Sequence, residues 1–180
     1  MKKDKKFIIS IDQGTTSSRA ILFDLKGQPV YSSQKEFTQY FPKSGWVEHD
    51  PEEIWSTTKK TLSNVLKKSK KIKGTILTIG ITNQRETTVL WDKKTGKAVY
   101  NAIVWQDRRQ EEFCKKLRKQ NKETLIFNRT GLLIDSYFSG TKIKWILDNV
   151  PLAKKLMKKK QLLFGTIDSF LIWRLTKGKV

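Results

Sequence analysis

The sequence contains very little cysteine and histidine. Among its 180 residues, Cys114 is the only cysteine and His49 the only histidine. A single cysteine excludes a disulfide within the chain and any metal site built on cysteine pairs, and it is typical of proteins of a reducing compartment. Because no serine or cysteine nucleophile motif lies beside it, His49 is expected to have a structural role rather than a catalytic one.

Long apolar stretches are also lacking. The basic N-terminus, Met1 to Lys6, is followed by the short apolar run Phe7 to Ile11, which is too short for the core of a signal peptide. No stretch approaches the roughly 20 apolar residues that are needed to cross a bilayer. We therefore expect a soluble, cytoplasmic protein with no membrane partner.

Acidic residues are scarce relative to basic ones. The chain has 37 Lys and Arg against 17 Asp and Glu, which gives a formal net charge of +20. Such a balance is found in proteins that bind nucleic acid or anionic membranes. Here the excess is spread as lysine pairs, such as Lys59-Lys60 and Lys154-Lys155, without an arginine-rich arm or a groove-reading motif. This favours a solvated lysine surface and no nucleic-acid partner; a functional polyanion patch is the alternative.

The sequence is instead rich in alternating strand and helix patterns. Three strands, at 7–11, 20–24 and 29–37, are joined by short turns and predict an antiparallel meander. Asp50 before Pro51 predicts the N-cap of a helix over 51–68. Further strands are expected at 75–82 (buried), 87–91, 98–105 and 162–164. Further helices are expected at 107–120, at 139–149, from Pro151 and at 166–175. Loops are expected at 38–49 and 121–136. Strands and helices in this order predict an α/β domain with a mixed sheet over residues 1–180.

The stretch from Asp12 to Arg19 is a candidate anion site. It links two apolar strands and holds Gly14 and four hydroxyl side chains. We expect Gly14 to allow a turn in which a Cβ would clash, so that backbone N–H groups, hydroxyls and the Arg19 guanidinium surround phosphate oxygens. Asp12 lies at a strand end, where a carboxylate can hold Mg²⁺ through waters. The alternative is a polar hairpin whose side chains satisfy their own backbone.

Other polar groups suggest a binding site for a small polyol. Arg85 and Glu86 lie side by side between two predicted strands, where one can donate to a hydroxyl while the other accepts. The alternatives are a surface pair, or two side chains on opposite faces of a strand. Trp105 can form an apolar wall for substrate carbons or belong to the core. Tyr137 can reach a ligand or be a buried loop residue. The pair Arg108-Arg109 is interpreted as solvated helix surface.

Six segments of the sequence stand out together. They are Asp12–Arg19, Gly45–Pro51, Ile81–Thr87, Trp105–Arg108, Tyr137–Lys142 and Phe164–Ser169. Together they resemble one family, the glycerol kinases among the FGGY carbohydrate kinases. The resemblance runs from about Phe7 to Thr176, in the order of that family's N-terminal part. It implies the actin/Hsp70/hexokinase-like (ribonuclease H-like) α/β fold, of which this chain would form an incomplete N-terminal lobe.

The resemblance implies two sets of ligand contacts. The first, here called the phosphate set, would hold the ATP phosphates through three hydroxyls and an arginine, and Mg²⁺ through an aspartate and water. Its members are Thr15, Thr16, Ser17, Arg19 and, for Mg²⁺, Asp12. The second, here called the polyol set, would bind glycerol through three polar side chains, with a tryptophan beside the carbon chain. Its members are Arg85, Glu86, Tyr137 and Trp105.

The resemblance also implies what residues 1–180 lack. The family's general-base aspartate is expected beyond Val180, and its adenosine pocket lies in a C-terminal lobe. We therefore expect an N-terminal part of a kinase that forms sn-glycerol 3-phosphate, inactive alone, whose C-terminal lobe is separately encoded or missing. The alternatives are a non-catalytic degenerate fragment, a kinase for another polyol or sugar, and a basic nucleic-acid-binding protein.

Overall fold

The computed structural model describes residues 5–179, which form two compact units. Unit 1 consists of residues 5–38 and Asp50–Gln84. Unit 2 consists of Gln39–His49 and residues 85–179. The phosphate set therefore falls in unit 1 and the polyol set in unit 2, and each unit is described by itself.

Unit 1 is built on a mixed sheet with the strand order β3-β2-β1-β5. The first three strands are β1 (Lys5–Gln13), β2 (Ser17–Asp24) and β3 (Pro29–Glu36), which pair antiparallel as the predicted meander. The fourth, β5 (Gly74–Thr82), runs parallel to β1 on its other side. The predicted mixed sheet is thus confirmed, and the β1–β2 turn that carries the phosphate set lies at one end of it.

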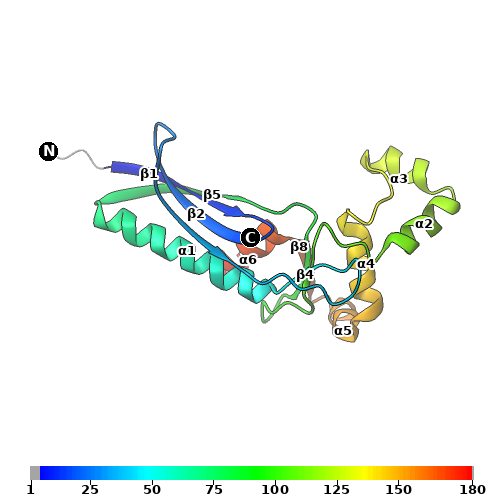
Figure 1. Ribbon diagram of the computed structural model, residues 1–180. Helices are drawn as coiled ribbons and strands as arrows, with labels where there is room; N and C mark the ends of the chain where they lie inside the picture. Colours follow the sequence, from blue (N-terminus) through cyan, green and yellow to red (C-terminus); the bar gives the residue numbers. More distant parts are fainter. Residues whose placement is uncertain (1–4, 180) are drawn as a thin grey trace. The chain divides into compact units, whose positions relative to one another are not determined.

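One long helix, α1 (Pro51–Lys71), covers one face of this sheet (Figure 1). Asp50 is its N-cap, as predicted, because the carboxylate accepts a hydrogen bond of 2.8 Å from Glu52 N. Acidic residues in the first turn and lysines in the last complement the helix dipole. The helix buries Ile54 and Val65 against the apolar face of β1 and β2, so the helical spacing of apolar residues correctly predicted the core.

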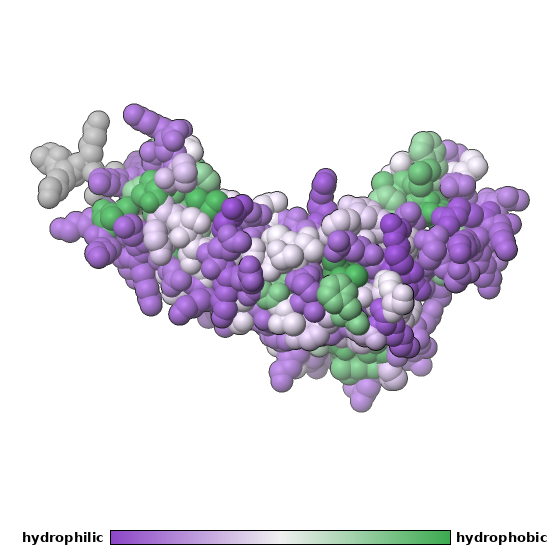
Figure 2. All heavy atoms as spheres, in the orientation of Figure 1, coloured by the Kyte–Doolittle hydropathy of each residue, from purple (hydrophilic) through white to green (hydrophobic). Residues whose placement is uncertain are grey.

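The expectation of a buried β5 is wrong. Its side chains are largely exposed, with Leu77 at 52% and Ile79 at 41%. The strand lies at the edge of the sheet, while α1 packs mainly over β2 and β3. Figure 2 shows apolar atoms at the surface of unit 1. An apolar run predicts a strand, but its burial also requires an element that covers it.

Unit 2 contains an antiparallel sheet with the order β4-β7-β6-β8. The strands are β4 (Glu48–His49), β6 (Thr88–Asp92), β7 (Ala102–Ile103) and β8 (Leu162–Thr166). The predicted strand over 98–105 is wrong for most of its length, because after a bridge to Trp91 the chain bends before β7. The short β4 was not predicted, because two residues give no period to detect.

Five helices complete unit 2: α2 (Glu111–Lys119), α3 (Glu123–Thr130), α4 (Ser139–Asn149), α5 (Pro151–Lys158) and α6 (Ile167–Leu175). The last three agree with the predictions. The helix expected from Asp107 begins four residues later, because the Asp107 carboxylate is a buried acceptor rather than a cap. The loop expected over 121–136 contains α3, which buries no residue. Within residues 5–179, no helix is long and apolar enough to cross a membrane.

Candidate functional site

The phosphate set lies on the β1–β2 turn of unit 1. Gly14 N donates to Ser17 O over 3.0 Å, which closes a tight turn with Thr15 and Thr16 at its tip. Thr16 is exposed, while Thr15 and Ser17 are half-buried, so none of the three residues is buried. The expected clash at Gly14 is wrong for this structure: a Cβ there would lie 3.4 Å from Ser17 O, an ordinary contact.

Asp12 and Arg19 face each other across the two strands that flank this turn. The Arg19 NH2 group donates to Asp12 Oδ2 over 2.5 Å, and its Nε donates to the same oxygen over 3.2 Å. The Arg19 side chain is 43% exposed and the Asp12 side chain 34%, so a ligand can reach both. Within the described part of the chain, no group of three or more Asp, Glu, His or Cys gathers into a metal cage. One accessible carboxylate beside the β1–β2 turn fits Mg²⁺, which typically keeps waters and takes few protein ligands.

A buried polar network supports the turn from below. Ser18 Oγ donates to Gln13 Oε1 over 2.8 Å, and Thr58 Oγ1 donates to the same oxygen over 3.1 Å. Gln13, Ser18 and Thr58 are almost completely buried. These hydroxyls tie both ends of the turn to α1. The sequence analysis missed them, because isolated Thr residues on an apolar helix face carry no motif.

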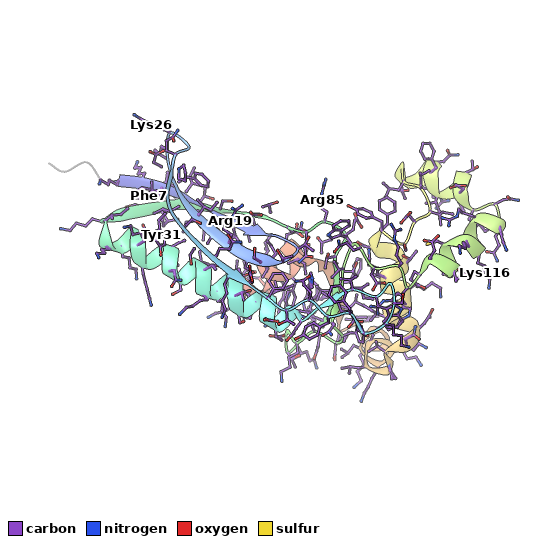
Figure 3. All side chains as sticks on the ribbon, viewed as in Figure 1. Phe7, Arg19, Lys26, Tyr31, Arg85 and Lys116 are labelled. Carbon is purple, nitrogen blue, oxygen red and sulfur yellow. The ribbon has the colours of Figure 1, made fainter. Side chains whose placement is uncertain are left out.

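The polyol set begins in the turn between β5 and β6, outside either strand. Glu86 has a φ of +64°, a left-handed conformation that is strained for a residue with a side chain and that tends to occur at functional sites. Its carboxylate oxygen Oε2 accepts bonds from Ser139 N (2.9 Å) and Ser139 Oγ (2.7 Å) at the start of α4. Arg85 is exposed, and Figure 3 shows its side chain extending away from the ribbon.

The two aromatic members of the polyol set contact each other. The rings of Trp105 and Tyr137 meet edge to face, with centroids 6.0 Å apart, and both residues are half-buried. Tyr137 N donates to Asp135 Oδ1 over 2.7 Å, and Trp105 N donates to Thr87 Oγ1 over 3.3 Å. Unit 2 therefore brings Glu86, Trp105 and Tyr137 together through neighbouring residues, while Arg85 extends into solvent next to them.

Arg109 occupies a buried site that sequence reasoning missed. Its side chain is 1% exposed, so the prediction of a solvated surface is wrong for this residue. Its guanidinium lies 3.9 Å from the ring centroid of Trp46 and forms ion pairs of 2.7 Å with Glu48 and 2.8 Å with Asp107. Arg108, by contrast, is 58% exposed, as predicted. The Arg109 cluster fixes the segment that follows Trp105.

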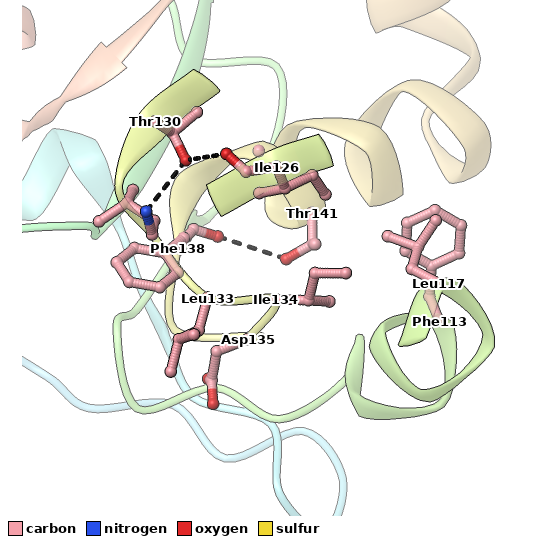
Figure 4. Close-up of a pocket in the computed structure, with 11 residues that line it drawn as sticks. Phe113, Leu117, Ile126, Thr130, Leu133, Ile134, Asp135, Phe138 and Thr141 are labelled. Atoms are coloured by element: carbon pink, nitrogen blue, oxygen red, sulfur yellow. Dashed lines mark hydrogen bonds between the residues drawn. The ribbon is translucent and has the colours of Figure 1, made fainter. Parts of the chain in front are cut away.

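An apolar pocket of 330 Å³ opens elsewhere in unit 2, between α2, α3 and the start of α4 (Figure 4). Most of its lining is aliphatic or aromatic, including Phe113, Leu117 and Leu133. None of the four members of the polyol set lines it. A polyol needs partners for each hydroxyl group, so this pocket is a poor candidate for a polyol site.

The chain is similar to known proteins over nearly its whole length. The model of the family described as "FGGY family of carbohydrate kinases, N-terminal domain" matches residues 7–180. The glycerol kinase of Alkaliphilus metalliredigens is 60% identical over 176 residues, which cover 98% of this chain and 35% of that protein. The glycerol kinase of Malacoplasma penetrans is 58% identical over 180 residues, which cover all of this chain and 36% of that protein.

Solved structures show the same fold. A crystal structure of Plasmodium falciparum glycerol kinase with ADP matches with a TM-score of 0.91 and 38% identity, over 97% of this chain and 35% of that one. A gluconate kinase from Lactobacillus acidophilus matches with a TM-score of 0.80 and 24% identity, over 95% of this chain and 33% of that one, which shows the fold alone. The chain spans about a third of the length of the relatives that it matches.

Proposed function

Because the chain belongs to the FGGY family of carbohydrate kinases, we propose that it carries the phosphate set and the polyol set of an ATP-dependent glycerol kinase. The observation that carries the proposal is that Lys142 Nζ donates to the backbone carbonyls of both Glu86 and Tyr137, which links the strained Glu86 to the residue whose ring contacts Trp105. Residues 1–180 would form a partial N-terminal kinase domain.

On the polyol side, Glu86 would accept a hydrogen bond from a glycerol hydroxyl. Both bonds from Ser139 go to Oε2, which leaves Oε1 for a ligand. Arg85 is exposed and would fold over the ligand to donate to a second hydroxyl, while the Tyr137 hydroxyl binds a third. Trp105 would pack against the carbon chain. Vicinal hydroxyls held in this way discriminate against analogues that lack them.

On the phosphate side, the turn hydroxyls and backbone of Thr15, Thr16 and Ser17 would surround the ATP phosphates. Arg19 would move from Asp12 to a phosphate oxygen, because a phosphate offers a stronger bidentate partner than one carboxylate oxygen. Asp12 would hold Mg²⁺ mainly through water, and the ion would neutralise charge on the phosphates. Phosphoryl transfer of this kind depends chiefly on positioning and charge neutralisation.

The complete reaction would need more than these 180 residues. We propose that the general base and the adenosine pocket are supplied by a C-terminal lobe, either continuous with this chain or separately encoded. Without an opposing lobe, the two sets would bind ligands without excluding water from the reacting groups.

The test is a chimera in which residues 1–180 replace the matching segment of the Malacoplasma penetrans glycerol kinase, which aligns with the whole chain. Glycerol-dependent ADP release is expected, and Glu86→Gln should reduce kcat/KM for glycerol by about 100-fold because it removes a charged acceptor. Gluconate and xylulose serve as competing substrates. A folded chimera that releases no ADP would support the alternative of a degenerate, non-catalytic fragment. A preference for gluconate or xylulose would assign the chain to a kinase of the same family with another substrate.

A further inference from the structure

The ammonium group of Lys142 is buried and has no carboxylate partner in the described part of the chain. Lys142 is 1% exposed and is among the largest fully buried side chains. Its Nζ donates to Glu86 O over 3.1 Å and also to Tyr137 O. The Nζ lies 5.8 Å from the centroid of the Tyr137 ring. A buried charge is costly unless its hydrogen bonds are made, so these two carbonyls are the partners that keep it there.

Those two carbonyls belong to the two residues proposed to bind polyol hydroxyls. Glu86 comes from the turn before β6, and Tyr137 from the segment before α4. Lys142 is the side chain that joins these distant segments, and Ser139, one turn earlier on α4, holds the Glu86 carboxylate. Side chains from the first turn of α4 thus bond to both the backbone carbonyl and the carboxylate of Glu86.

The strained conformation of Glu86 needs such support. Its φ of +64° is disfavoured for glutamate and persists only where the surroundings determine it. Thr88 Oγ1 donates to the same carbonyl over 3.2 Å, which adds a second, uncharged bond. If the Lys142 bond were lost, Glu86 could relax and turn its carboxylate away from the Trp105–Tyr137 pair.

We propose that Lys142 is a positioning residue that sets the geometry of the polyol site by holding the backbone of Glu86 and Tyr137 together. It does not touch the polyol, because Lys142 is 1% exposed and its two hydrogen bonds go to backbone carbonyls in the interior. This inference rests on the proposed glycerol site and deepens it: specificity for a small polyol depends on a residue beneath the site.

The first experiment uses the full chain, isotopically labelled, with glycerol titrated while the amide signals of Glu86 and Tyr137 are followed by NMR. In Lys142→Met, which keeps the volume but removes the donors, the dissociation constant should rise about tenfold, the size expected for losing hydrogen bonds from a charged group. Ile146→Ala is the matched control. Ile146 lies on the same helix and is fully buried in the hydrophobic core, and it makes no hydrogen bond to the site. It should change glycerol affinity by less than about twofold.

The second experiment needs no substitution. Burial lowers the pKa of Lys142 to about 8, with Glu86, Asp107, Asp135 and Cys114 as the charged or titratable groups around it. Carboxylates stay ionised above pH 7, and burial raises the pKa of the Cys114 thiol. Glycerol affinity of the unmodified chain should therefore fall as pH rises from 7 to 9, while that of Lys142→Met should stay flat. A structural role alone would not produce this difference.

The outcomes separate the inference from the proposed function. If glycerol shifts no signal of Glu86 or Tyr137 in the unmodified chain, the proposed glycerol site fails. The positioning role is then judged without ligand, by whether Lys142→Met moves the Glu86 and Tyr137 amide signals more than Ile146→Ala does. If Lys142→Met moves the Glu86 and Tyr137 signals no more than Ile146→Ala does, the positioning role is overturned. If glycerol does bind, equal affinities of Lys142→Met and Ile146→Ala, or an affinity independent of pH from 7 to 9, would overturn it as well.

Discussion

Ser18 Oγ and Thr57 Oγ1 lie 2.8 Å apart in the interior of unit 1, where both residues are almost completely buried. Ser18 immediately follows the members of the phosphate set in the β1–β2 turn, and Thr57 lies on α1. The contact is therefore a direct hydrogen bond between the base of the turn and the helix that supports the sheet. Gln13 and Thr58 extend it into a closed polar network.

Replacing Ser18 by alanine should destabilise unit 1. The change removes one hydrogen-bond partner from the buried polar atoms of Gln13 and Thr57, which costs about 2 kcal/mol of unfolding free energy. Chemical denaturation of Ser18→Ala and of Ser56→Ala provides the measurement, because Ser56 is an exposed hydroxyl on the same helix. The control should stay within about 0.5 kcal/mol of the unmodified chain. Equal stabilities of the two variants would show that the network contributes nothing measurable.

Much of unit 1 was predictable from the sequence, for a clear physical reason. The strands and α1 each have a strong apolar period, and Asp50-Pro51 is a local signal that the helix starts there. The burial of β5 was not predictable, because exposure depends on what packs over an edge strand. The strand expected over 98–105 failed for a similar reason: a bend before β7 is set by contacts with β6 rather than by the local sequence.

Arg109 and Arg108 are adjacent but should respond very differently to the same substitution. Arg109→Met leaves Glu48 and Asp107 buried without their cation, so we expect a loss of about 3–5 kcal/mol. Arg108→Met breaks an exposed pair with Asp135 at 3.2 Å and a long hydrogen bond of 3.3 Å to Ser136 Oγ, so we expect a loss of only about 1 kcal/mol.

Urea denaturation of the two variants at the same pH and salt concentration gives the comparison. A difference between them of less than about 1 kcal/mol would contradict the burial seen at Arg109. High salt should weaken the small effect at Arg108 and leave the larger one unchanged, because buried pairs are screened little.

Acid should destabilise unit 2 through His49. Burial lowers the pKa of this imidazole to about 4, against an ordinary value of 6.5. The unfolded chain therefore binds a proton between these values while the folded chain does not, so stability is full above pH 6.5 and falls as pH drops toward 4. The loss between pH 7 and pH 5 should be about 2 kcal/mol.

His49→Gln isolates this contribution, because glutamine does not titrate. The difference in unfolding free energy between the unmodified chain and His49→Gln should change by about 2 kcal/mol between pH 7 and pH 5. A constant difference over this range would show that His49 takes up a proton as readily in the folded chain as in the unfolded one, in conflict with its complete burial beside Gln39.

The candidate site was only partly predictable. The phosphate and polyol sets could be chosen because their motifs are local and resemble a known family. The residues that hold them in place were not found: Lys142 lay within a quoted motif but had no assigned role, and Ser139 and Arg109 act through neighbours distant in sequence. Such contacts carry no local pattern, because any of several residue types can supply a buried donor. A positive φ at Glu86 is likewise invisible, since nothing in its side chain favours that conformation.

The final prediction concerns competition between Asp12 and ATP for Arg19. In the unmodified chain, Mg²⁺ should strengthen ATP binding if Asp12 helps to hold the ion as proposed. Asp12→Asn removes that ligand and also frees Arg19 from its ion pair. The Mg²⁺ dependence should therefore disappear, while ATP binding in EDTA should tighten by about twofold to fivefold, the range expected for losing an exposed ion pair.

The measurement is a titration of the chain with ATP, followed by the ³¹P signal of the γ-phosphate, with and without Mg²⁺. Asp24→Asn is the matched control, since Asp24 ends β2, the strand that carries Arg19, but its carboxylate accepts hydrogen bonds from Lys26 N and Gln28 N in the turn to β3. It should leave both affinities unchanged. Retention of the Mg²⁺ effect in Asp12→Asn would place the metal on other groups. Weaker binding of that variant in EDTA would show that Asp12 orients Arg19 for phosphate rather than competing for it.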